Sequence, residues 1–436
     1  SDYLNLRGIL AMPYYSDNNL EEQNHLAERK LMKNEIKVLV STIKLGMGYD
    51  KPDISFVIHY QQPGSVVAYY QQIGRAGRSI KDAYCYLLTG QEDQDILNYF
   101  IENAFPTNEQ ANRIIHALEN SDGLSSVQLE TKCNIERSKL LQFITLLENE
   151  DFIYKNDTKY YRSAKKYMYN GDHYQTVKRM KYAEKEAMKG YIETEKCLSR
   201  YIVNLLDDGT DVNCGKCYNC MAGSILPTVE VPSLDEISLV AEYLDSIYIK
   251  IEPRKRWPQT NMGLDEKMVI TYQNEYGVAL ARYGDIGYGQ MVSYDKYHAN
   301  GYREELISKS VQVLQSYVKI NKITHITIVP SFRNTKVNQF AKEIAKRLNL
   351  QYIELFSKKE SPEQKKMQNS YFQAKNVIES VFLTKDLVVP KHILLVDDIV
   401  DSRWTLTVCG WLLKQAGAVV VVPYCLADSS EKGGYR

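Results

Sequence analysis

A cluster of four cysteines constrains the fold of this chain more than any other feature. Cys197, Cys214, Cys217 and Cys220 lie within one short stretch. Two C-x2-C steps on one turn, with a fourth cysteine near the end of a preceding helix, suit a closed tetrahedral site of four thiolates. The spacing predicts a structural Zn²⁺ site, with an iron–sulfur cluster or free thiols as alternatives. The remaining cysteines stand in apolar surroundings and are expected to be buried: Cys85, Cys133, Cys409 and Cys425.

The N-terminus and the composition predict where the protein resides. Ser1–Leu4 has neither the basic region nor the apolar run of a signal peptide, and the start looks cut from a longer chain. No apolar run approaches the ~18 residues that span a bilayer. We therefore expect a cytoplasmic, nucleoid-associated protein of bacterial type with no membrane contact. Because 54 basic and 54 acidic residues cancel, any nucleic-acid-binding surface must be local.

The chain divides into five predicted segments. Residues 1–107 alternate strand-like and helical runs, which is typical of a parallel sheet. Residues 108–163 predict three helices and a hairpin, either a winged helix or a small bundle with a frayed hairpin. Residues 164–226 are helical and hold the cysteines, residues 227–267 predict a connector, and residues 268–436 return to α/β alternation.

Two stretches of basic residues have more than one interpretation. Residues 155–190 hold ten Lys and Arg against four acids, either to neutralise phosphates or as a solvated face. On the predicted wing, Lys155 and Lys159 are candidate phosphate contacts. In the connector, Arg254–Trp257 either clamps nucleic acid or packs on its neighbours.

Two segments of the first part carry nucleotide chemistry. Ser41–Pro52 (STIKLGMGYDKP) leaves a strand on small residues and glycines, so backbone N–H groups can approach phosphates. Tyr69–Arg78 (YYQQIGRAGR) places Arg75 and Arg78 three residues apart, on one side of a helical turn. A guanidinium there can reach charge that develops on a γ-phosphate held by a neighbouring domain. The chain itself has no G-x-x-x-x-G-K-[ST] loop to cradle that phosphate.

These segments resemble motifs V and VI in the second RecA-like lobe of RecQ-family DNA helicases. The cysteine spacing is similar to the RecQ zinc-binding subdomain, so the resemblance covers residues 1–224. It implies an ATP-dependent 3′→5′ DNA helicase that acts in repair or recombination. It also implies ATP with Mg²⁺, shared with a first lobe absent here, and single-stranded or junction-containing DNA as partner. This part alone is therefore expected not to hydrolyse ATP.

The resemblance assigns roles to individual residues. By motif VI, Arg78 is the arginine finger, Arg75 contacts ATP or the lobe interface, and Gln71 is the motif's glutamine. The family usually continues with Asp-Gly, whereas Ser79 and Ile80 follow here. By motif V, the residues implied to contact nucleotide and DNA backbone, or to couple the two, are Thr42, Gly46, Gly48 and Asp50.

A third segment suits a sugar phosphate. Ile393–Thr405 reads as a buried strand that ends in paired carboxylates, followed by a polar loop that opens a helix. Carboxylates can bind ribose hydroxyls, while amides at a helix N-terminus hold a phosphate. The segment resembles the PRPP motif of type I phosphoribosyltransferases, and residues 268–436 resemble their ComF-like branch, although Arg403 replaces the usual glycine. The implied PRPP- or nucleotide-binding residues are Asp397, Asp398, Asp401, Ser402 and Thr405.

We therefore expect an α/β multidomain protein. Its parts are a RecA-like parallel-sheet lobe, a small winged helix, a helical zinc-binding platform and a phosphoribosyltransferase-like α/β domain. The expected function is that of the C-terminal part of a RecQ-type helicase, with the last domain either active or kept as a binding scaffold. The alternatives are a phosphoribosyltransferase or nucleotide-metabolising enzyme tethered to DNA, and a non-enzymatic DNA-binding regulator. The sequence does not indicate an oligomeric state.

Overall fold

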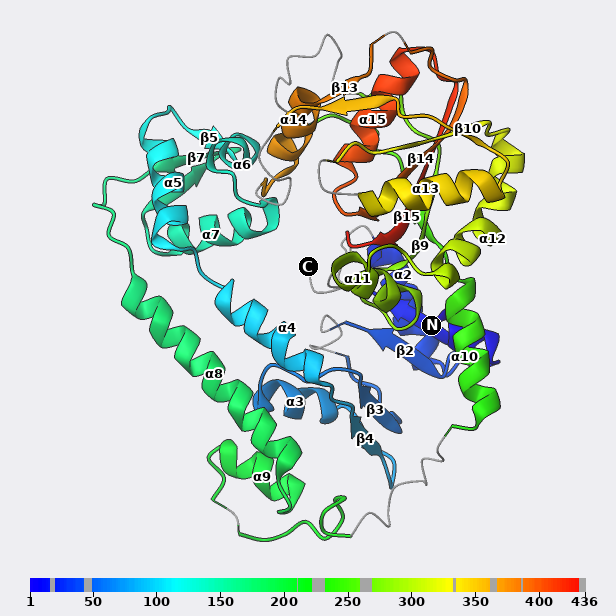
Figure 1. Cartoon of the computed structure of the whole chain (residues 1–436). Coiled ribbons are helices and arrows are strands. Elements are labelled where there is room, and N and C mark those ends of the chain that lie inside the picture. The colour runs from blue at the N-terminus through cyan, green and yellow to red at the C-terminus, as the bar shows by residue number, and fades with distance from the viewer. Residues whose placement is uncertain are drawn as a thin grey trace. The chain divides into compact units, whose positions relative to one another are not determined.

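The computed structural model forms two compact units (Figure 1). One unit comprises Ser1–Phe105 and Asn170–Leu239, and the other comprises Pro106–Tyr169 and Val240–Arg436. None of the described helices has the length and apolarity needed to cross a membrane. The described residues are 1–15, 20–42, 49–209, 211–221, 232–258, 269–331, 335–360, 367–385 and 387–430.

The first unit contains an α/β lobe and a helical platform. Its strands form two parallel pairs, β1 with β2 and β3 with β4, which confirms the predicted parallel-sheet lobe. The elements of the lobe are α1 (Asp2–Leu6), β1 (Ala11–Tyr14), α2 (Glu21–Met32), β2 (Val38–Ser41), β3 (Phe56–His59), α3 (Val66–Ile73), β4 (Tyr84–Leu87) and α4 (Gln91–Glu102). The platform helices are α8 (Gly171–Glu193) and α9 (Leu198–Leu205), and α10 (Leu234–Ser246) crosses the boundary between the units.

The platform packs against α3, the helix that leads into the two arginines. Ser65 caps α3 by accepting a hydrogen bond from the Ala68 N–H, 3.2 Å away. Tyr69 of α3 is 2% exposed, and its ring centroid lies 5.2 Å from that of Tyr191 on α8. The position of α3 therefore depends on packing against α8, as well as on the strands of the lobe that precede and follow it.

Two lysines of the basic run bind α8 to α4. Helix α8 runs beside α4 (Figure 1), and Lys178 Nζ and Tyr182 Oη both donate to the Glu102 carboxylate, at 2.8 and 2.7 Å. Lys185, only 8% exposed, donates to Asn98 Oδ1 at 2.8 Å. These two lysines hold the platform onto the lobe, so they are not available to neutralise phosphates.

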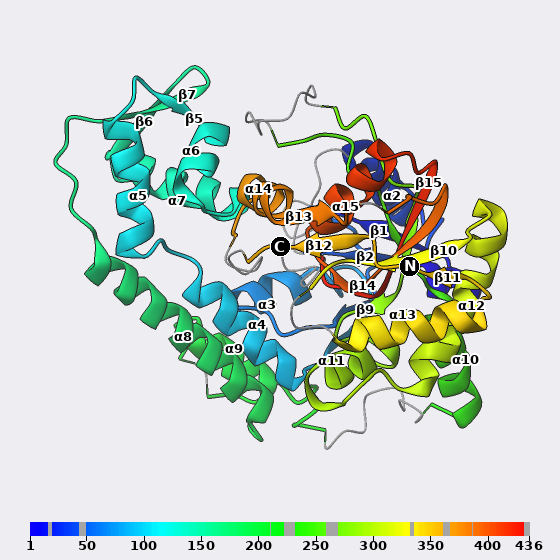
Figure 2. The same cartoon turned by 45° about the horizontal axis from the view of Figure 1, so that its top comes forward.

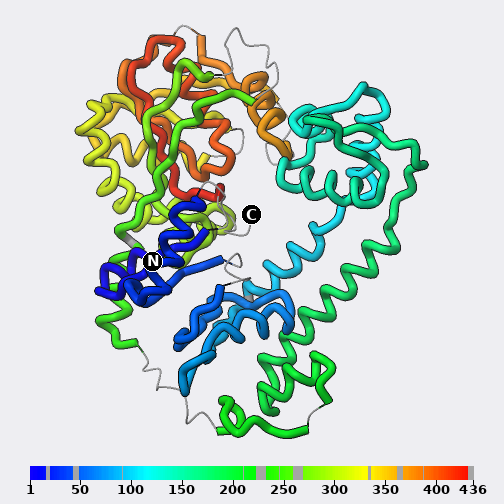
Figure 3. Tube along the Cα trace, turned by 180° about the vertical axis from the view of Figure 1, so that it is seen from behind, coloured from blue at the N-terminus to red at the C-terminus, as the bar shows by residue number. Residues whose placement is uncertain are grey.

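Residues 106–169, coloured cyan to green in Figure 3, lie in one part of the chain. They form three helices and a small sheet of order β5-β7-β6. Thr107 and Ser125 open α5 and α6 with capping boxes that Gln110 and Gln128 complete. Four residue pairs join β6 to β7, so the hairpin is formed rather than frayed. The elements are α5 (Asn108–Glu119), β5 (Leu124–Ser125), α6 (Ser126–Cys133), α7 (Arg137–Asn149), β6 (Ile153–Asn156) and β7 (Lys159–Arg162).

The C-terminal domain is built on a six-stranded sheet of order β11-β10-β14-β15-β9-β8, in which only β8 is antiparallel to its neighbour. Helices α14 and α15 cover one face of the sheet, while α11, α12 and α13 cover the other (Figure 2). Its strands are β8 (Ile249–Ile251), β9 (Gly277–Arg282), β10 (His325–Ile328), β11 (Gln351–Tyr352), β14 (His392–Val400) and β15 (Val420–Asp428), with a separate pair β12 (Phe356–Lys358) and β13 (Val381–Leu383). Its helices are α11 (Tyr288–His298), α12 (Glu304–Asn321), α13 (Thr335–Arg347), α14 (Ser370–Ser380) and α15 (Trp404–Gln415).

The structure differs from the sequence-based expectations in three places. The segment expected to be a connector contains α10 and β8, and β8 joins the C-terminal sheet by pairing with β9. Strand β14 continues in register with β15 as far as Val400, two residues beyond the paired aspartates, so the polar loop begins only at Asp401. Finally, Cys85 is exposed, whereas Cys133, Cys409 and Cys425 are buried as expected.

Candidate functional site

The structure brings the two arginines of the first lobe to the segment that ends the glycine-rich motif. Arg75 Nη1 donates to the carbonyl oxygen of Tyr49 at 3.2 Å, and Arg78 Nη1 pairs with the carboxylate of Asp50. The side chain of Arg78 is 41% exposed, and Arg75 is half-buried. Neither guanidinium is enclosed in the lobe's interior, so both can meet an anion that docks from outside.

Backbone contacts hold the turn that carries these arginines. Gly77 adopts φ +76°, and its N–H donates to the Ile54 carbonyl at 3.0 Å. A side chain would be strained in this left-handed conformation, which explains the glycine between the arginines. The next residue after Arg78, Ser79, donates its N–H to the Pro52 carbonyl at 2.8 Å. The segment that differs from the resembled helicase motif is therefore fixed to the end of the first motif.

The other residues predicted for this site lie around the same region or outside the described residues. Gln71 is exposed on α3. Thr42 is exposed just after β2, and its N–H donates to the Tyr14 carbonyl at 3.4 Å. Gly46 and Gly48 lie outside the described residues. Burial, and then the neighbouring charge of Arg78, lower the pKa of Arg75, so the two guanidiniums form a positively charged pair.

The four clustered cysteines converge on one point. Their sulfur atoms all lie within 4.8 Å of one another. Cys217 Sγ is 3.9 Å from Cys197 Sγ, and Cys214 Sγ is 4.0 Å from Cys220 Sγ. A tetrahedron of thiolates at Zn–S distances of about 2.3 Å has edges of about 3.8 Å. The cluster therefore has the dimensions of a four-thiolate metal site.

Backbone N–H groups point at these sulfurs. Cys197 caps α9, and its Sγ accepts from the N–H groups of Arg200 at 3.5 Å and Cys214 at 3.2 Å. Cys217 Sγ accepts from the Leu198 N–H at 3.3 Å. Such donors favour the thiolate form that binds metal. The turn is closed by Asn219, whose side-chain amide donates to two carbonyls before α9, each at 2.7 Å. These contacts fit a structural zinc site with no open coordination position.

In the C-terminal domain, the paired aspartates lie at the carboxyl end of β14. Asp398 is buried, and its Oδ2 lies 3.0 Å from Lys296 Nζ and 3.2 Å from the Tyr302 hydroxyl. Asp397 is half-buried, and it accepts from the Asp398 N–H at 2.9 Å. Burial, and then the charge of Asp398, raise the pKa of Asp397 well above its usual value. One carboxylate is thus already paired, and the other favours its neutral form.

Lys296 and Tyr302 were not among the predicted site residues. Lys296 is near the end of α11, a helix whose last carbonyls accept from Lys336 Nζ at 2.8 and 2.9 Å. Arg303, next to Tyr302, clamps the buried carboxylate of Asp295 with three contacts of 2.5–3.1 Å. The sequence signal for Lys296 was only its place in the ComF-like stretch, and its contact with Asp398 spans about a hundred residues of chain.

The loop after β14 has a residue in the left-handed conformation that usually requires glycine, although this residue is an arginine. Arg403 has φ +65°, in the left-handed region. Its Nη1 donates to the Glu252 carbonyl at 3.2 Å, and it immediately precedes α15. The other residues that the resemblance placed here lie on this loop and the first turn of α15: Asp401, exposed, and Ser402 and Thr405, half-buried.

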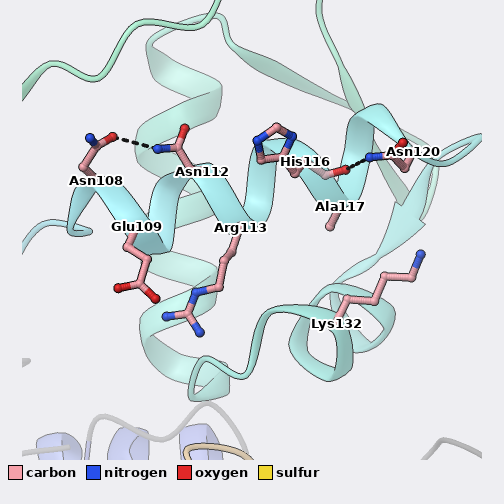
Figure 4. A pocket seen from close by; sticks show the side chains of 8 residues that line it. All are labelled: Asn108, Glu109, Asn112, Arg113, His116, Ala117, Asn120 and Lys132. Carbon is pink, nitrogen blue, oxygen red and sulfur yellow. Dashed lines mark hydrogen bonds between the residues drawn. The ribbon is translucent and has the colours of Figure 1, made fainter.

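A separate open groove lies on the winged-helix part, lined by α5 and by Lys132 of α6, with a volume of about 890 Å³. Figure 4 shows Asn108, Asn112, His116 and Asn120 along one side of α5. Asn112 donates to Asn108 Oδ1, and Asn120 donates to the His116 carbonyl, both at 2.9 Å. None of the residues predicted for a site lines this groove.

Comparison with known proteins agrees with the features of the first part. Residues 1–79 match the helicase conserved C-terminal domain. ATP-dependent DNA helicase RecQ of Synechocystis is 26% identical over 235 residues, which cover 51% of this chain and 46% of that protein. ATP-dependent DNA helicase Q1 of Pongo abelii is 47% identical over 87 residues, which cover 20% of this chain and 13% of that protein. The chain spans less than half the length of these relatives, and about half of it is similar to a part of a RecQ helicase.

Two solved structures are also similar in part. A hypoxanthine-guanine phosphoribosyltransferase from Bacillus anthracis is 19% identical, and the match covers 30% of this chain and 70% of that chain at a TM-score of 0.21. The RNA helicase Prp28 from Chaetomium thermophilum is 26% identical, and the match covers 23% of this chain and 25% of that chain at a TM-score of 0.19. Scores of this size carry no functional conclusion.

Proposed function

We propose that this chain is the C-terminal part of an ATP-dependent DNA helicase of RecQ type that moves 3′→5′ in DNA repair or recombination. The observation that carries the proposal is the placement of Arg75 and Arg78 beside Tyr49 and Asp50 on an accessible face of the lobe. ATP with Mg²⁺ binds between this face and a lobe that supplies the phosphate-cradling loop. DNA, single-stranded or with a junction, is the substrate.

In this proposal Arg78 is the residue that acts on the reacting phosphate. Its guanidinium exchanges the Asp50 carboxylate for the charge that develops on the γ-phosphate. Arg75, held by the Tyr49 carbonyl, positions the turn and adds positive charge. Zn²⁺ at the four cysteines keeps the platform rigid behind α3, so that α3 presents the arginines at a fixed angle. The chemistry therefore needs both a lobe with a Walker A sequence and this one.

The test compares Arg78→Ala with Lys81→Ala in a polypeptide that also contains a Walker A lobe. Lys81 is an exposed cation three residues further on, so its removal matches the change in charge. We expect Arg78→Ala to lower the kcat of DNA-stimulated ATP hydrolysis by about 10³-fold or more, and Lys81→Ala to change it little. Equal activity of the two variants, with unchanged thermal unfolding, would refute the role of Arg78. The 436-residue chain alone is expected to hydrolyse no ATP.

A second function is proposed for the C-terminal domain: binding of a sugar phosphate such as PRPP at Asp397 and Asp398. It is supported by the position of these carboxylates near the carboxyl end of a parallel strand that leads through a short loop into α15. Calorimetric titration with PRPP and Mg²⁺ should give heat that the double variant Asp397→Asn, Asp398→Asn abolishes. If the unchanged chain binds no PRPP at millimolar concentration, the domain is a scaffold.

A further inference from the structure

Residues 249–257, here called the strap, lie against the loop that precedes α15. Strand β8 at its start pairs with β9, and Trp257 at its end is 4% exposed. The ring of Trp257 stacks on Trp404, with centroids 5.9 Å apart, and meets Trp411 edge-on at 5.7 Å. Trp257 is therefore a core residue and cannot stack on a nucleic-acid base. The cations of the strap remain as candidates for binding.

Two arginines form hydrogen bonds between the strap and the loop. Arg254 Nε donates to the Ser402 carbonyl at 2.8 Å, and its guanidinium lies 4.2 Å above the Trp404 ring. Arg403 reaches the opposite way and donates to the Glu252 carbonyl at 3.2 Å. Each arginine thus uses one backbone carbonyl, and the two guanidiniums lie near each other at the amino end of α15.

This pair of charges has no anionic partner within the described part of the chain. None of the described carboxylates forms an ion pair with Arg254 or Arg403, and Arg403 Nε is buried without a hydrogen-bond acceptor. Burial, and then the charge of Arg403, lower the pKa of Arg254 to about 10. Two half-buried like charges without a counter-ion are unfavourable. An anion placed between them would relieve both the repulsion and the missing hydrogen bond.

The surroundings define the kind of anion. The amino end of α15, a helix of 12 residues, has no side-chain cap and adds its positive dipole end. The strap carries four cations against one acid, Glu252, and two of those cations, Lys255 and Arg256, are exposed beside Arg254. A row of cations beside two arginines that have no anionic partner suits a chain of phosphates better than a single small ion.

We propose that the strap and Arg403 form a binding site for the phosphate backbone of nucleic acid on the C-terminal domain. One phosphate lies between Arg254 and Arg403, and neighbouring phosphates meet Lys255 and Arg256. The site is separate from the arginines of the first lobe and needs no ATP. The site also gives a function to the arginine at position 403, where the resembled motif has glycine. A glycine could hold a phosphate only through backbone amides and has no side chain to contact a polymer.

The tryptophans provide a local assay. The chain has only three tryptophans, and all of them belong to the cluster of Trp257, Trp404 and Trp411. Tryptophan emission therefore reports on this site and on no other nucleic-acid-binding part of the chain. Titration with single-stranded oligo(dT), excited where the oligonucleotide does not absorb, should change the emission saturably, because Arg254 lies directly over Trp404.

The decisive variant is Arg254→Gln with Arg403→Gln, and the matched control is Lys319→Gln with Lys346→Gln, which removes two exposed cations of the same domain. The arginine pair should lose the emission change and lower the slope of log affinity against log salt by about 0.7 for each lost phosphate contact. The control pair should keep both. An arginine variant that binds oligo(dT) with the same slope and emission change as the unchanged chain would overturn the proposal.

A second variant and a second ligand complete the test. If the arginine pair does not fold, Lys255→Gln with Arg256→Gln changes only exposed side chains and should still lower the salt slope. An unchanged slope in that variant would also count against the site. Titration with ribose 5-phosphate separates a polymer from a small ligand: a saturable emission change with this compound and none with oligo(dT) would replace nucleic acid by a free sugar phosphate.

Discussion

Removal of one cysteine from the four-thiolate cluster is the most direct test of the structure. We choose Cys214→Ala, with Cys85→Ala as its control, because Cys85 is an exposed cysteine outside the cluster. Structural zinc in small domains binds with about 10–16 kcal/mol, so one of four thiolates contributes about 2.5–4 kcal/mol. Since 1.4 kcal/mol is about tenfold, Cys214→Ala should weaken zinc binding by about two to three orders of magnitude.

The structure also predicts which segments lose their structure when the metal is lost. Residues 211–221 contain no buried apolar side chain, and their cysteines are only half-buried. This segment therefore has no hydrophobic core of its own, and the metal cluster is what holds it together. Helices α8 and α9, in contrast, are anchored by Met188, Tyr191 and Ile202, which pack on Tyr69. Metal loss should therefore expose residues 211–221 to proteases while leaving the helical circular dichroism almost unchanged.

The assay is metal analysis combined with cobalt substitution. The unchanged chain and Cys85→Ala should each contain about one zinc per chain, and Co²⁺ should give a thiolate-to-metal charge-transfer band. Cys214→Ala should show neither at the same free metal concentration. Iron with sulfide in the unchanged chain would select the iron–sulfur alternative. Equal zinc retention by both variants would show that the four sulfurs do not bind one metal ion together.

Three single substitutions test other parts of the structure. Burial lowers the pKa of His59, so stability should decrease as the pH falls below about 6.5, where the unfolded chain gains the proton first, and His59→Gln should flatten this part of the profile in urea unfolding. Phe143, 1% exposed in the winged-helix core, should cost about 3–5 kcal/mol of unfolding free energy when changed to Ala. Arg403→Gly should be about 1 kcal/mol more stable than Arg403→Ala, because only Ala keeps the left-handed strain; the reverse order in thermal unfolding would contradict φ +65°.

Features that depend on near neighbours in the chain could be predicted from the sequence. The alternation of strands and helices expected for residues 1–107 includes α3, which forms as Val66–Ile73 with Ser65 as its cap, because cap and apolar spacing are local. The four cysteines meet as expected, because three of them share one turn. The three helices and hairpin of residues 108–163 follow from the same kind of signal.

Features that depend on distant contacts could not be predicted. The pairing of Asp398 with Lys296 and Tyr302 joins side chains about a hundred residues apart. The contact of Arg254 with the Ser402 carbonyl joins residues 148 apart. No period or spacing in the sequence encodes either contact, because both depend on which edge of the sheet the segments reach. The strand β8 was missed for the same reason, since three residues gain a strand conformation only by pairing with β9.

Arg403 shows how a difference from a resembled motif becomes informative once its contacts are known. From the sequence alone, a bulky residue in place of glycine is expected to destabilise the loop. The left-handed conformation costs about 1–2 kcal/mol for a residue other than glycine. The structure keeps the left-handed backbone and connects the new side chain to Glu252, while Arg254 binds the adjacent carbonyl in return. The loop shape is therefore maintained by the strap rather than by a glycine. A charged hydrogen bond of about 1.5–3 kcal/mol is enough to offset the strain, so the substitution can persist without loss of the fold.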